Sequence, residues 1–274
     1  MSVSIEIKEK NLTILLPDNE KIELILCNAG TFNMGSAKNE ISHMRNECLH
    51  QVTLTKDFYL GKYTLTAAQI DAIFKIDQDD EWEKTKRVYK GVYEHFCAGK
   101  GEDGSYPAPV GIYVANRIFS LFNKILENSL PEKYYFDFPT EAQWEYACRA
   151  GTETGLNNGK NVTVMHGECP NLDEIAWYCH NSDRKIKPVG LKKPNAWGFY
   201  DMLGNVWEHT RSTLYEFSEK PEIDPECFGY RGYSRIIRGG CYWDEPWRCR
   251  SAMRGQYVDG EQRYLGTRIA LISK

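Results

Sequence analysis

Alternating apolar and polar residues predict β-strands in the first quarter of the chain. The alternation covers residues 2–16 and 21–26, and the polar run 17–20 (PDNE) between them has the composition of a tight turn. Residues 51–60 alternate in the same way and predict a further strand. The segment 30–36 (GTFNMGS) is punctuated by glycine, which predicts a loop.

Two capping boxes predict where two helices begin. Thr66 and Thr140 are each followed three residues later by glutamine. In such a box the threonine oxygen accepts a backbone N–H of the first helical turn, and the glutamine side chain returns a hydrogen bond. The first helix should run to about residue 76, and Gly151 should end the second.

A third helix is predicted between residues 110 and 126, where apolar side chains recur at helical spacing. These side chains are Val110, Val114, Ile118, Leu121, Phe122 and Ile125. The polar stretch 77–109 predicts a long excursion, and residues 152–274 carry mostly loop signals. Since no linker or break in composition divides the chain, we expect one α+β domain over residues 1–274 with a loop-rich second half.

Composition and charge exclude several classes of protein. With 34 basic and 38 acidic residues, the net charge of −4 offers no basic surface for nucleic acid. No apolar run approaches the roughly 20 residues that span a bilayer. Residues 1–10 lack the apolar core of a signal peptide. This predicts a cytoplasmic protein, or one at the cell surface if an export or lipoprotein signal is missing from this chain.

Nine scattered cysteines predict mostly buried, reduced thiols, with one reactive thiol or one disulfide as the alternative. The chain has no C-x-x-C pair, and no histidine falls at zinc-finger spacing from a cysteine pair. A G-x-G-x-x-G run occupies residues 99–104. The sequence SYPAP follows it, so no helix can begin there to bind a pyrophosphate, and we exclude a dinucleotide site.

The basic residues change type along the chain. Through residue 220 there are 19 Lys and 6 Arg, whereas the remainder has one Lys and 8 Arg. Arginine forms bidentate hydrogen bonds and stacks on aromatic rings. These arginines alternate with tyrosine and tryptophan, which indicates either an internal network with partners such as Glu145 and Glu208, or a recognition surface. Both readings are compatible, because buried arginines can support a surface made of the residues between them.

Six sequence blocks then occur in a recognisable order: residues 30–36, 139–151, 194–208, 238–240, 248–254 and 265–269. Together they resemble the formylglycine-generating enzyme (sulfatase-modifying factor) domain family, over about residues 24–271. The resemblance implies a C-type-lectin-like fold of the formylglycine-generating-enzyme type, which agrees with a loop-rich second half.

The resemblance does not extend to the family's catalytic cysteines. Oxygenases of this family bind copper through a pair of cysteines in the segment that here reads CYWDEPW (241–247). Cys241 takes a place that is usually serine, and Cys249 matches a later, non-catalytic position. We therefore expect no catalytic residue and no copper. Two alternatives remain, an oxidase with a relocated thiol pair that includes Cys241 and Cys249, and a structural accessory domain.

One branch of this fold comprises the variable proteins of diversity-generating retroelements, in which the C-terminal segment is diversified and binds ligands. The corresponding segment here is 238–268, where Cys241 replaces Ser, Thr267 replaces Phe, and 255–264 is a mixed run. This resemblance implies a non-catalytic protein that binds an unidentified protein or other macromolecule, with an oligomeric state that the sequence leaves open. The implied ligand-binding residues are Tyr242, Trp243, Asp244, Glu245, Trp247, Gln256, Tyr257, Asp259, Glu261, Gln262 and Tyr264.

The block 201–208 (DMLGNVWE) resembles the family's structural calcium loop. The resemblance implies that Asp201 and Glu208 donate carboxylates to Ca²⁺, and that Gly204 and Val206 donate backbone carbonyls. Oxygen ligands on a tight loop suit this ion. The alternative is that Glu208 pairs with an arginine and no ion binds.

Overall fold

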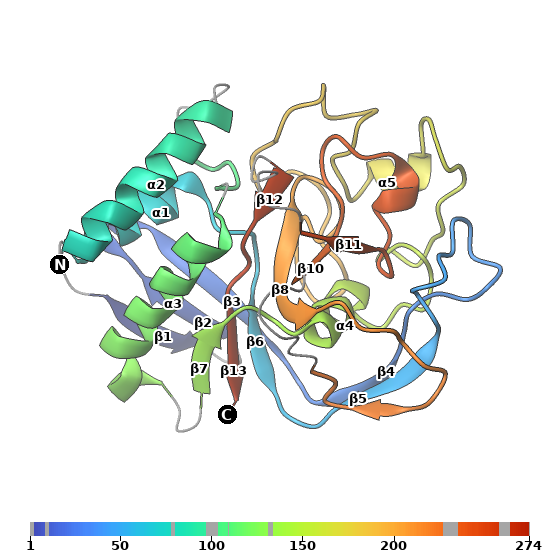
Figure 1. The fold of residues 1–274 in the computed structure, drawn as a ribbon, viewed down its shortest axis with the longest axis horizontal. Coiled ribbons are helices and arrows are strands. Elements are labelled where there is room, and N and C mark those ends of the chain that lie inside the picture. The colour runs from blue at the N-terminus through green and yellow to red at the C-terminus, as the bar shows by residue number, and fades with distance from the viewer. Residues whose placement is uncertain are drawn as a thin grey trace.

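Three β-sheets organise the chain in the computed structural model, which describes residues 3–8, 11–77, 80–96, 104–108, 110–130, 134–226, 235–257 and 264–273 (Figure 1). The largest sheet has the strand order β1-β2-β3-β6-β13-β7, the second β11-β10-β8-β12 and the third β4-β5-β9. The strands are β1 Ser4–Lys8, β2 Asn11–Leu15, β3 Lys21–Cys27, β4 Gly30–Met34, β5 His50–Leu54, β6 Phe58–Gly61, β7 Tyr134–Asp137, β8 Trp207–Thr213, β9 Glu222–Ile223, β10 Arg235–Arg238, β11 Arg254–Gln256, β12 Leu265–Gly266 and β13 Ala270–Ser273.

The predicted strand over residues 2–16 is in fact two antiparallel strands, β1 and β2, in which Lys8 lies opposite Asn11. The alternating pattern correctly predicts extended structure here, but it does not predict that the segment divides into two strands. The two residues between the paired positions are Glu and Lys, which carry no turn signal, so the pattern alone does not reveal the hairpin. The turn predicted at 17–20 is a short 3₁₀ helix, η1 Pro17–Asn19.

The prediction of a loop at 30–36 was wrong, because β4 Gly30–Met34 pairs antiparallel with β5 His50–Leu54. Here Gly30 marks a close approach of side chain to backbone: a Cβ at this position would lie 2.3 Å from the hydroxyl oxygen of Tyr146. The segment 51–60 forms two strands in two sheets, β5 and β6, rather than one.

Both predicted capping boxes are present. Thr66 precedes α1 Ala67–Ile73 and Thr140 precedes α4 Glu141–Arg149, and in each box the threonine and glutamine exchange hydrogen bonds. Helix α1 ends slightly earlier than predicted. Helix α4 ends as expected, with Ala150 and Gly151 both in left-handed conformations.

The polar stretch 77–109 contains a helix that the sequence analysis missed, α2 Asp80–Phe96. Two aromatic side chains on it, Trp82 and Tyr89, are buried although most of their neighbours are polar. This narrow apolar stripe was hidden by the charged residues around it. The helix predicted at 110–126 is α3 Ile112–Ile125, and its predicted apolar residues are buried, except for Ile125, which is 38% exposed.

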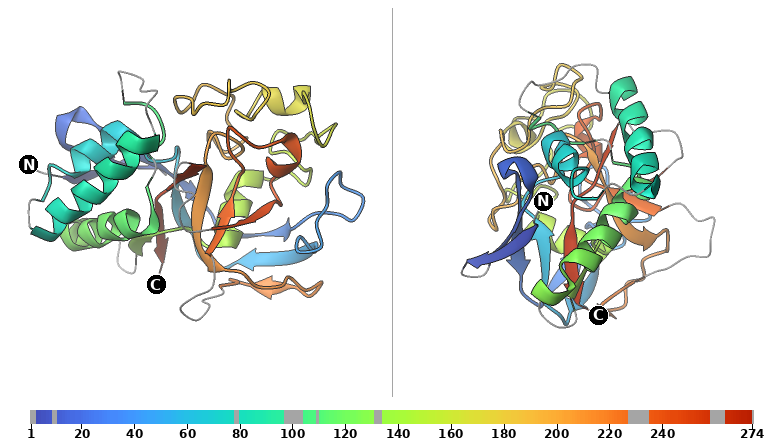
Figure 2. Two further views of the ribbon diagram at one scale, coloured as in Figure 1. Left: turned by 45° about the horizontal axis from the view of Figure 1, so that its top comes forward. Right: turned by 90° about the vertical axis from the view of Figure 1, so that its left-hand side faces the viewer.

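Helices α1, α2 and α3 cover one face of the six-stranded sheet, and the loop-rich half of the chain, including α4, covers the other (Figures 1 and 2). Strand β13 illustrates the two layers. Leu271 packs in the cluster with the three helices, whereas Ala270 and Ile272 pack in the cluster with α4. Because side chains alternate along a strand, the three consecutive residues 270–272, buried on both faces, are all apolar.

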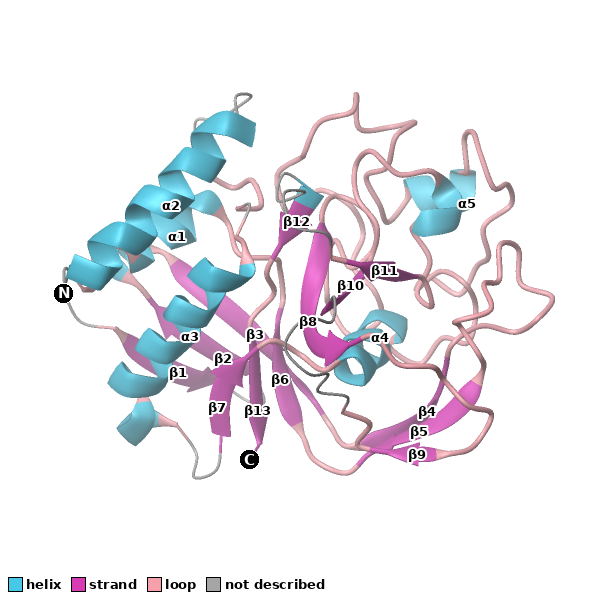
Figure 3. Ribbon diagram, in the orientation of Figure 1, coloured by secondary structure: helices cyan, strands magenta, loops and turns pink. Residues whose placement is uncertain are grey.

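The second half has the expected scarcity of regular structure, with loops around short elements (Figure 3). These elements include α5 Pro170–Asp173 and η3 Pro246–Arg248, and a further 3₁₀ helix, η2 Glu127–Ser129, follows α3. None of the helices in the described ranges combines the length and apolar character needed to cross a membrane.

Candidate functional site

Four buried arginines support the C-terminal segment from inside. Arg238, Arg250, Arg254 and Arg268 are each at most 4% exposed. Arg254 forms a bidentate ion pair with Glu141, at 2.7 Å from Nε to Oε1 and 2.8 Å from Nη2 to Oε2. These residues are sequence neighbours of the predicted binding surface, but their guanidinium groups are directed into the protein.

The glutamates that the sequence suggested as arginine partners are confirmed. Glu145 accepts hydrogen bonds from Arg238 and from Nε of Arg149. Glu208 pairs with Arg268, whose Nη2 lies 2.7 Å from Oε1. A buried charge is stable only when it is paired, so these pairs hold distant segments in one arrangement.

A cavity of about 160 Å³ lies between the four-stranded sheet and the loop that follows β10. Each strand of the sheet contributes one lining residue, and the loop contributes Cys241, Trp243, Asp244 and Arg248. The residues from the strands are Gln256 of β11, Ile237 of β10, Trp207 of β8 and Leu265 of β12, and Tyr257 and Tyr264 complete the lining. The sheet thus forms one wall of the cavity, and it positions the loop whose polar and aromatic side chains form the other wall.

Five of the predicted ligand-binding residues line this cavity: Trp243, Asp244, Gln256, Tyr257 and Tyr264. Trp243 is 47% exposed, and the guanidinium of Arg184 lies 4.8 Å from its ring centroid. Tyr242 lies beside the cavity, with its ring 5.7 Å from that of Tyr264. The result is an aromatic rim around a hollow, with one end of the indole open to solvent.

Asp244 is held in a defined orientation at the cavity wall. Its Oδ2 accepts a hydrogen bond from the backbone N–H of Cys241 at 2.9 Å, and its Oδ1 lies 3.3 Å from Nε of Arg248. The side chain of Arg248 also lies over the rings of Trp207 and Trp247. The wall therefore presents an oriented carboxylate and guanidinium pair to any ligand that enters.

The other predicted ligand-binding residues lie elsewhere. Glu245 is directed toward a neighbouring loop, where it accepts hydrogen bonds from Nε2 of His180 and the backbone N–H of Gly167. Trp247 is half-buried and packs beside the cavity without lining it. The remaining three, Asp259, Glu261 and Gln262, lie outside the described residues.

Sequence reasoning did not assign Trp207, Ile237, Leu265 or Arg184 to the site. The three apolar residues carry ordinary strand signals, so no local feature distinguishes them. Arg184 is distant in the chain from the segment that it contacts through Trp243. Cys241 and Arg248 were noticed as unusual, but their place in the cavity wall was not predicted.

The two cysteines nearest the site are buried thiols. Burial raises the pKa of Cys241 and of Cys249 well above the usual value, so both hold their protons near neutral pH. Cys241 is the single thiol among the described residues that line the cavity. All seven cysteines in the described part of the chain are free, which agrees with the prediction of reduced thiols.

The predicted calcium ligands do not fit that role as a set. Glu208 already accepts hydrogen bonds from Oγ1 of Thr64, Nε1 of Trp144 and the guanidinium of Arg268. A carboxylate surrounded by three donor side chains is a poor ligand for a cation. Of the alternative reading of the sequence, the pairing of Glu208 with an arginine is observed.

Asp201 differs from Glu208. Its Oδ2 accepts a hydrogen bond from the backbone N–H of Gly190, whereas its buried Oδ1 has no hydrogen-bond partner among the described residues. Burial raises the pKa of Asp201 to about 6. Calcium binding in this loop stays a prediction, and Asp201 is the predicted side chain with an oxygen available for it.

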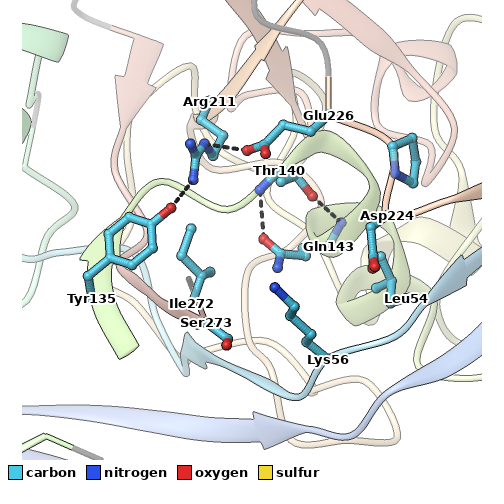
Figure 4. Close-up of a pocket in the computed structure, with 11 residues that line it drawn as sticks. Leu54, Lys56, Tyr135, Thr140, Gln143, Arg211, Asp224, Glu226, Ile272 and Ser273 are labelled. Carbon is cyan, nitrogen blue, oxygen red and sulfur yellow. Dashed lines mark hydrogen bonds and ion pairs between the residues drawn. The ribbon is translucent and has the colours of Figure 1, made fainter. Parts of the chain in front are cut away.

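A second cavity, of about 110 Å³, lies beside the N-terminus of α4 (Figure 4). Its polar groups bind one another: Nη1 of Arg211 donates to the hydroxyl of Tyr135 at 2.6 Å, and its Nε lies 2.7 Å from Glu226. Thr140 and Gln143 are occupied by the capping box. None of the predicted ligand-binding residues lines this cavity in the described structure. We therefore assign the candidate site to the first cavity, which Trp243 lines, and call it the cavity beneath Trp243.

Comparison with known proteins agrees with the fold and with the six sequence blocks. The sulfatase-modifying factor enzyme 1-like domain matches residues 15–272. The chain is 32% identical over 152 residues to the formylglycine-generating enzyme of Bos taurus, a match that covers 48% of this chain and 38% of the relative. The match thus spans well under half of the relative's length.

Solved structures share the fold at lower identity. Treponema denticola variable protein 1 superimposes with a TM-score of 0.75 at 20% identity, covering 96% of this chain and 99% of that one. PvdO from Pseudomonas aeruginosa superimposes with a TM-score of 0.69 at 23% identity, covering 91% and 94%. The predicted C-type-lectin-like fold of the formylglycine-generating-enzyme type is confirmed. With nearly its whole length matched, the chain belongs to the sulfatase-modifying factor enzyme 1-like domain family.

Proposed function

We propose that this protein is a non-catalytic member of its family that binds a protein or other macromolecule on the surface around the cavity beneath Trp243. One observation carries the proposal: within segment 238–268 the arginines Arg238, Arg250, Arg254 and Arg268 are buried and paired, while the aromatic residues between them form an accessible rim. Such a division supports a binding surface on a fixed scaffold.

The rim residues suit macromolecular recognition. Tyrosine and tryptophan offer large, rigid contact areas at low entropic cost, and they dominate binding hot spots. The exposed indole of Trp243 offers such an area, and Asp244 and Arg248 beside it offer oriented charges for specificity. The ligand itself has no fixed identity under this proposal.

We also infer that segment 238–268 is diversified, as in the variable proteins of diversity-generating retroelements. The fold likeness to the treponemal variable protein supports this inference, together with the place of one sequence departure, Cys241, and of Gln256, Tyr257 and Tyr264 from the mixed run in the cavity wall. A diversified segment needs a scaffold that tolerates change at its surface. Here the charged groups of the four scaffold arginines are buried, and they are separate from the rim side chains that would vary.

Sequencing the gene and its neighbourhood in many isolates tests this inference. We expect a near-copy of the 3′ coding segment beside a reverse transcriptase gene, with differences at adenines. The changed codons should include those of rim residues and spare the four scaffold arginines. Absence of both the copy and the reverse transcriptase, or changes spread evenly along the gene, would overturn the inference.

The alternative is a copper- and oxygen-dependent oxidase of the formylglycine-generating type, and the Bos taurus relative is named a formylglycine-generating enzyme. The position of Cys249 is a reason to test for an oxidase. A Cβ on Gly240 would lie 2.8 Å from Sγ of Cys249, so the Cys249 thiol lies against the backbone of the residue that precedes Cys241. A Cu(I) titration distinguishes the two functions. We expect no stoichiometric binding. One copper per chain that is lost in Cys241→Ser would instead support the oxidase.

A further inference from the structure

Four side chains with metal-binding groups meet beside the cavity, in loops that are far apart in the sequence. The Sγ of Cys179, a ring nitrogen of His180 and a carboxylate oxygen of Glu245 all lie within 4.8 Å of one another. Oε2 of Glu245 is 3.0 Å from Nε2 of His180 and 3.9 Å from Nδ1 of His166. All four residues lie outside the set that lines the cavity.

Hydrogen bonds hold the segments of Cys179, His180 and Glu245 together without using the side chains that would bind a metal. The N–H of Cys179 donates to the carbonyl of Asp244 at 3.1 Å, which fixes the segment of Cys179 and His180 against that of Glu245. The side chain of Asn181 donates to the carbonyl of Ala176 at 2.9 Å and orders the same turn. The third loop, which carries His166, approaches the cluster through the N–H of Gly167, which donates to Oε2 of Glu245 itself at 3.2 Å.

The spacing of Cys179, His180 and Glu245 is close to that of neighbouring ligands in a tetrahedral site, and His166 lies near enough to Glu245 to supply a fourth ligand. Zinc bonds of about 2.0–2.3 Å place neighbouring ligand atoms about 3.3–3.8 Å apart. Oε2 of Glu245 is 3.0 Å from Nε2 of His180 and 3.9 Å from Nδ1 of His166, distances on either side of this range, and the thiol of Cys179 lies within 4.8 Å of the ligand atoms of His180 and Glu245. The side chains of His180 and Glu245 are about one-third exposed, so an ion can reach them from solvent.

The chemistry of the donors selects the metal. Calcium and magnesium take oxygen ligands, whereas a mixed set of imidazole, thiolate and carboxylate suits zinc. We infer that Cys179, His180 and Glu245 bind one Zn²⁺ ion, with the nearby His166 as fourth ligand, and that the ion joins the loops at 166 and 179–180 to the loop that carries Trp243. The inference is independent of the proposed function, because the metal site and the cavity share no side chain.

The experiment uses tag-free protein, stripped of metal and then titrated with Zn²⁺ and, separately, with Co²⁺. We expect one ion per chain by elemental analysis and a thiolate-to-cobalt charge-transfer band in the absorption spectrum. Cys179→Ser should abolish the band. His180→Ala and Glu245→Gln should each weaken zinc binding more than about tenfold, since even outer-shell partners of a metal ligand contribute about 10- to 100-fold.

Cys48→Ser is the matched control, because it removes another partly buried thiol outside the cluster. It should retain both the zinc and the charge-transfer band. Circular dichroism of each metal-free variant should match that of the metal-free parent, which separates loss of the site from loss of the fold. Less than stoichiometric zinc in the parent, or an unchanged band in Cys179→Ser, would overturn the inference.

Discussion

The two faces of the six-stranded sheet are covered by layers with different chemistry. On one face, helices α1, α2 and α3 bury an aliphatic and aromatic cluster against β2, β3 and β13. On the other face, a loop-rich layer combines an apolar cluster with four buried arginines and their glutamate partners. The same sheet thus supports one layer that depends on shape and volume and another that also depends on exact pairing of charges.

This difference follows from the regular structure available to each layer. Helices satisfy their own backbone hydrogen bonds and can pack through side-chain volume alone. Loops leave backbone carbonyls that need donors, and the arginines supply them: Arg238 donates to three carbonyls, those of Ser251, Ala252 and Met253. A guanidinium with five N–H groups can therefore replace missing secondary structure.

The largest expected effect comes from breaking one buried ion pair. Arg268→Met leaves Glu208 charged and buried without its main partner, so we expect a loss of about 3–5 kcal/mol in the free energy of unfolding. Arg268→Lys should also destabilise strongly, because an ammonium cannot reproduce the bidentate fork. Urea denaturation measures both.

The control for that comparison lies in the helical layer. Ile118→Leu conserves volume at a fully buried position of α3 and should cost less than about 1.5 kcal/mol. If Ile118→Leu proves more damaging than Arg268→Lys, the distinction between the two layers fails.

A smaller effect, dependent on pH, comes from His209 on β8. Neither ring nitrogen has a hydrogen-bond partner among the described residues, and burial, with a contribution from Arg235, lowers its pKa to about 3. The unfolded chain then binds more protons between pH 3 and 6.5, so this contribution to stability is complete above pH 6.5 and is lost as the pH falls.

From pH 7 to pH 5 the loss from His209 should be about 2 kcal/mol. We expect His209→Phe to reduce the pH dependence of the unfolding free energy by that amount, because its ring can still pack against Phe138 and Tyr257. Equal pH dependence in the parent and the variant would show that His209 is not the group responsible.

The helix caps should contribute equally in both layers. Thr66 caps α1 in the helical layer and Thr140 caps α4 in the loop-rich layer, with the same pair of hydrogen bonds. Thr66→Ala and Thr140→Ala should each cost about 1 kcal/mol. A much larger loss for Thr140→Ala, measured by thermal unfolding, would indicate that the loop-rich layer also depends on this cap for its tertiary contacts.

The smallest effect on stability should come from the rim. Trp243 is 47% exposed, and we expect Trp243→Ala to change the unfolding free energy by no more than about 0.5 kcal/mol. A rim that varies freely on a stable scaffold requires such tolerance. A loss comparable to that of Arg268→Met would place Trp243 in the scaffold instead.

Local signals predicted part of the fold well. Both capping boxes and the helix at 112–125 were found because caps and helical periodicity involve residues only three or four positions apart. Helix α2 was missed because its buried side chains, such as Trp82, become apparent only against α1 and Phe74. Gly30 was misread because the reason for glycine there is the distant ring of Tyr146.

The candidate site, like the fold, was predictable from the sequence only in part. The choice of arginine over lysine indicated a special C-terminal segment, and Glu145 and Glu208 were correctly named as partners. Which of the predicted residues share a cavity, and which others join them, was not predictable, because Gln256, Trp243 and Trp207 meet only after three strands and a loop come together.

By itself the sequence determined the family and the expected fold, because these are recorded in ordered motifs along the chain. The tertiary structure alone decided that the arginine paired with Glu208 is Arg268, that Glu245 turns away from the cavity, and that Cys179 and His180 lie beside Glu245. The physical reason is that charge pairing and metal coordination depend on distances of a few ångströms between loops whose separation in sequence carries no periodicity.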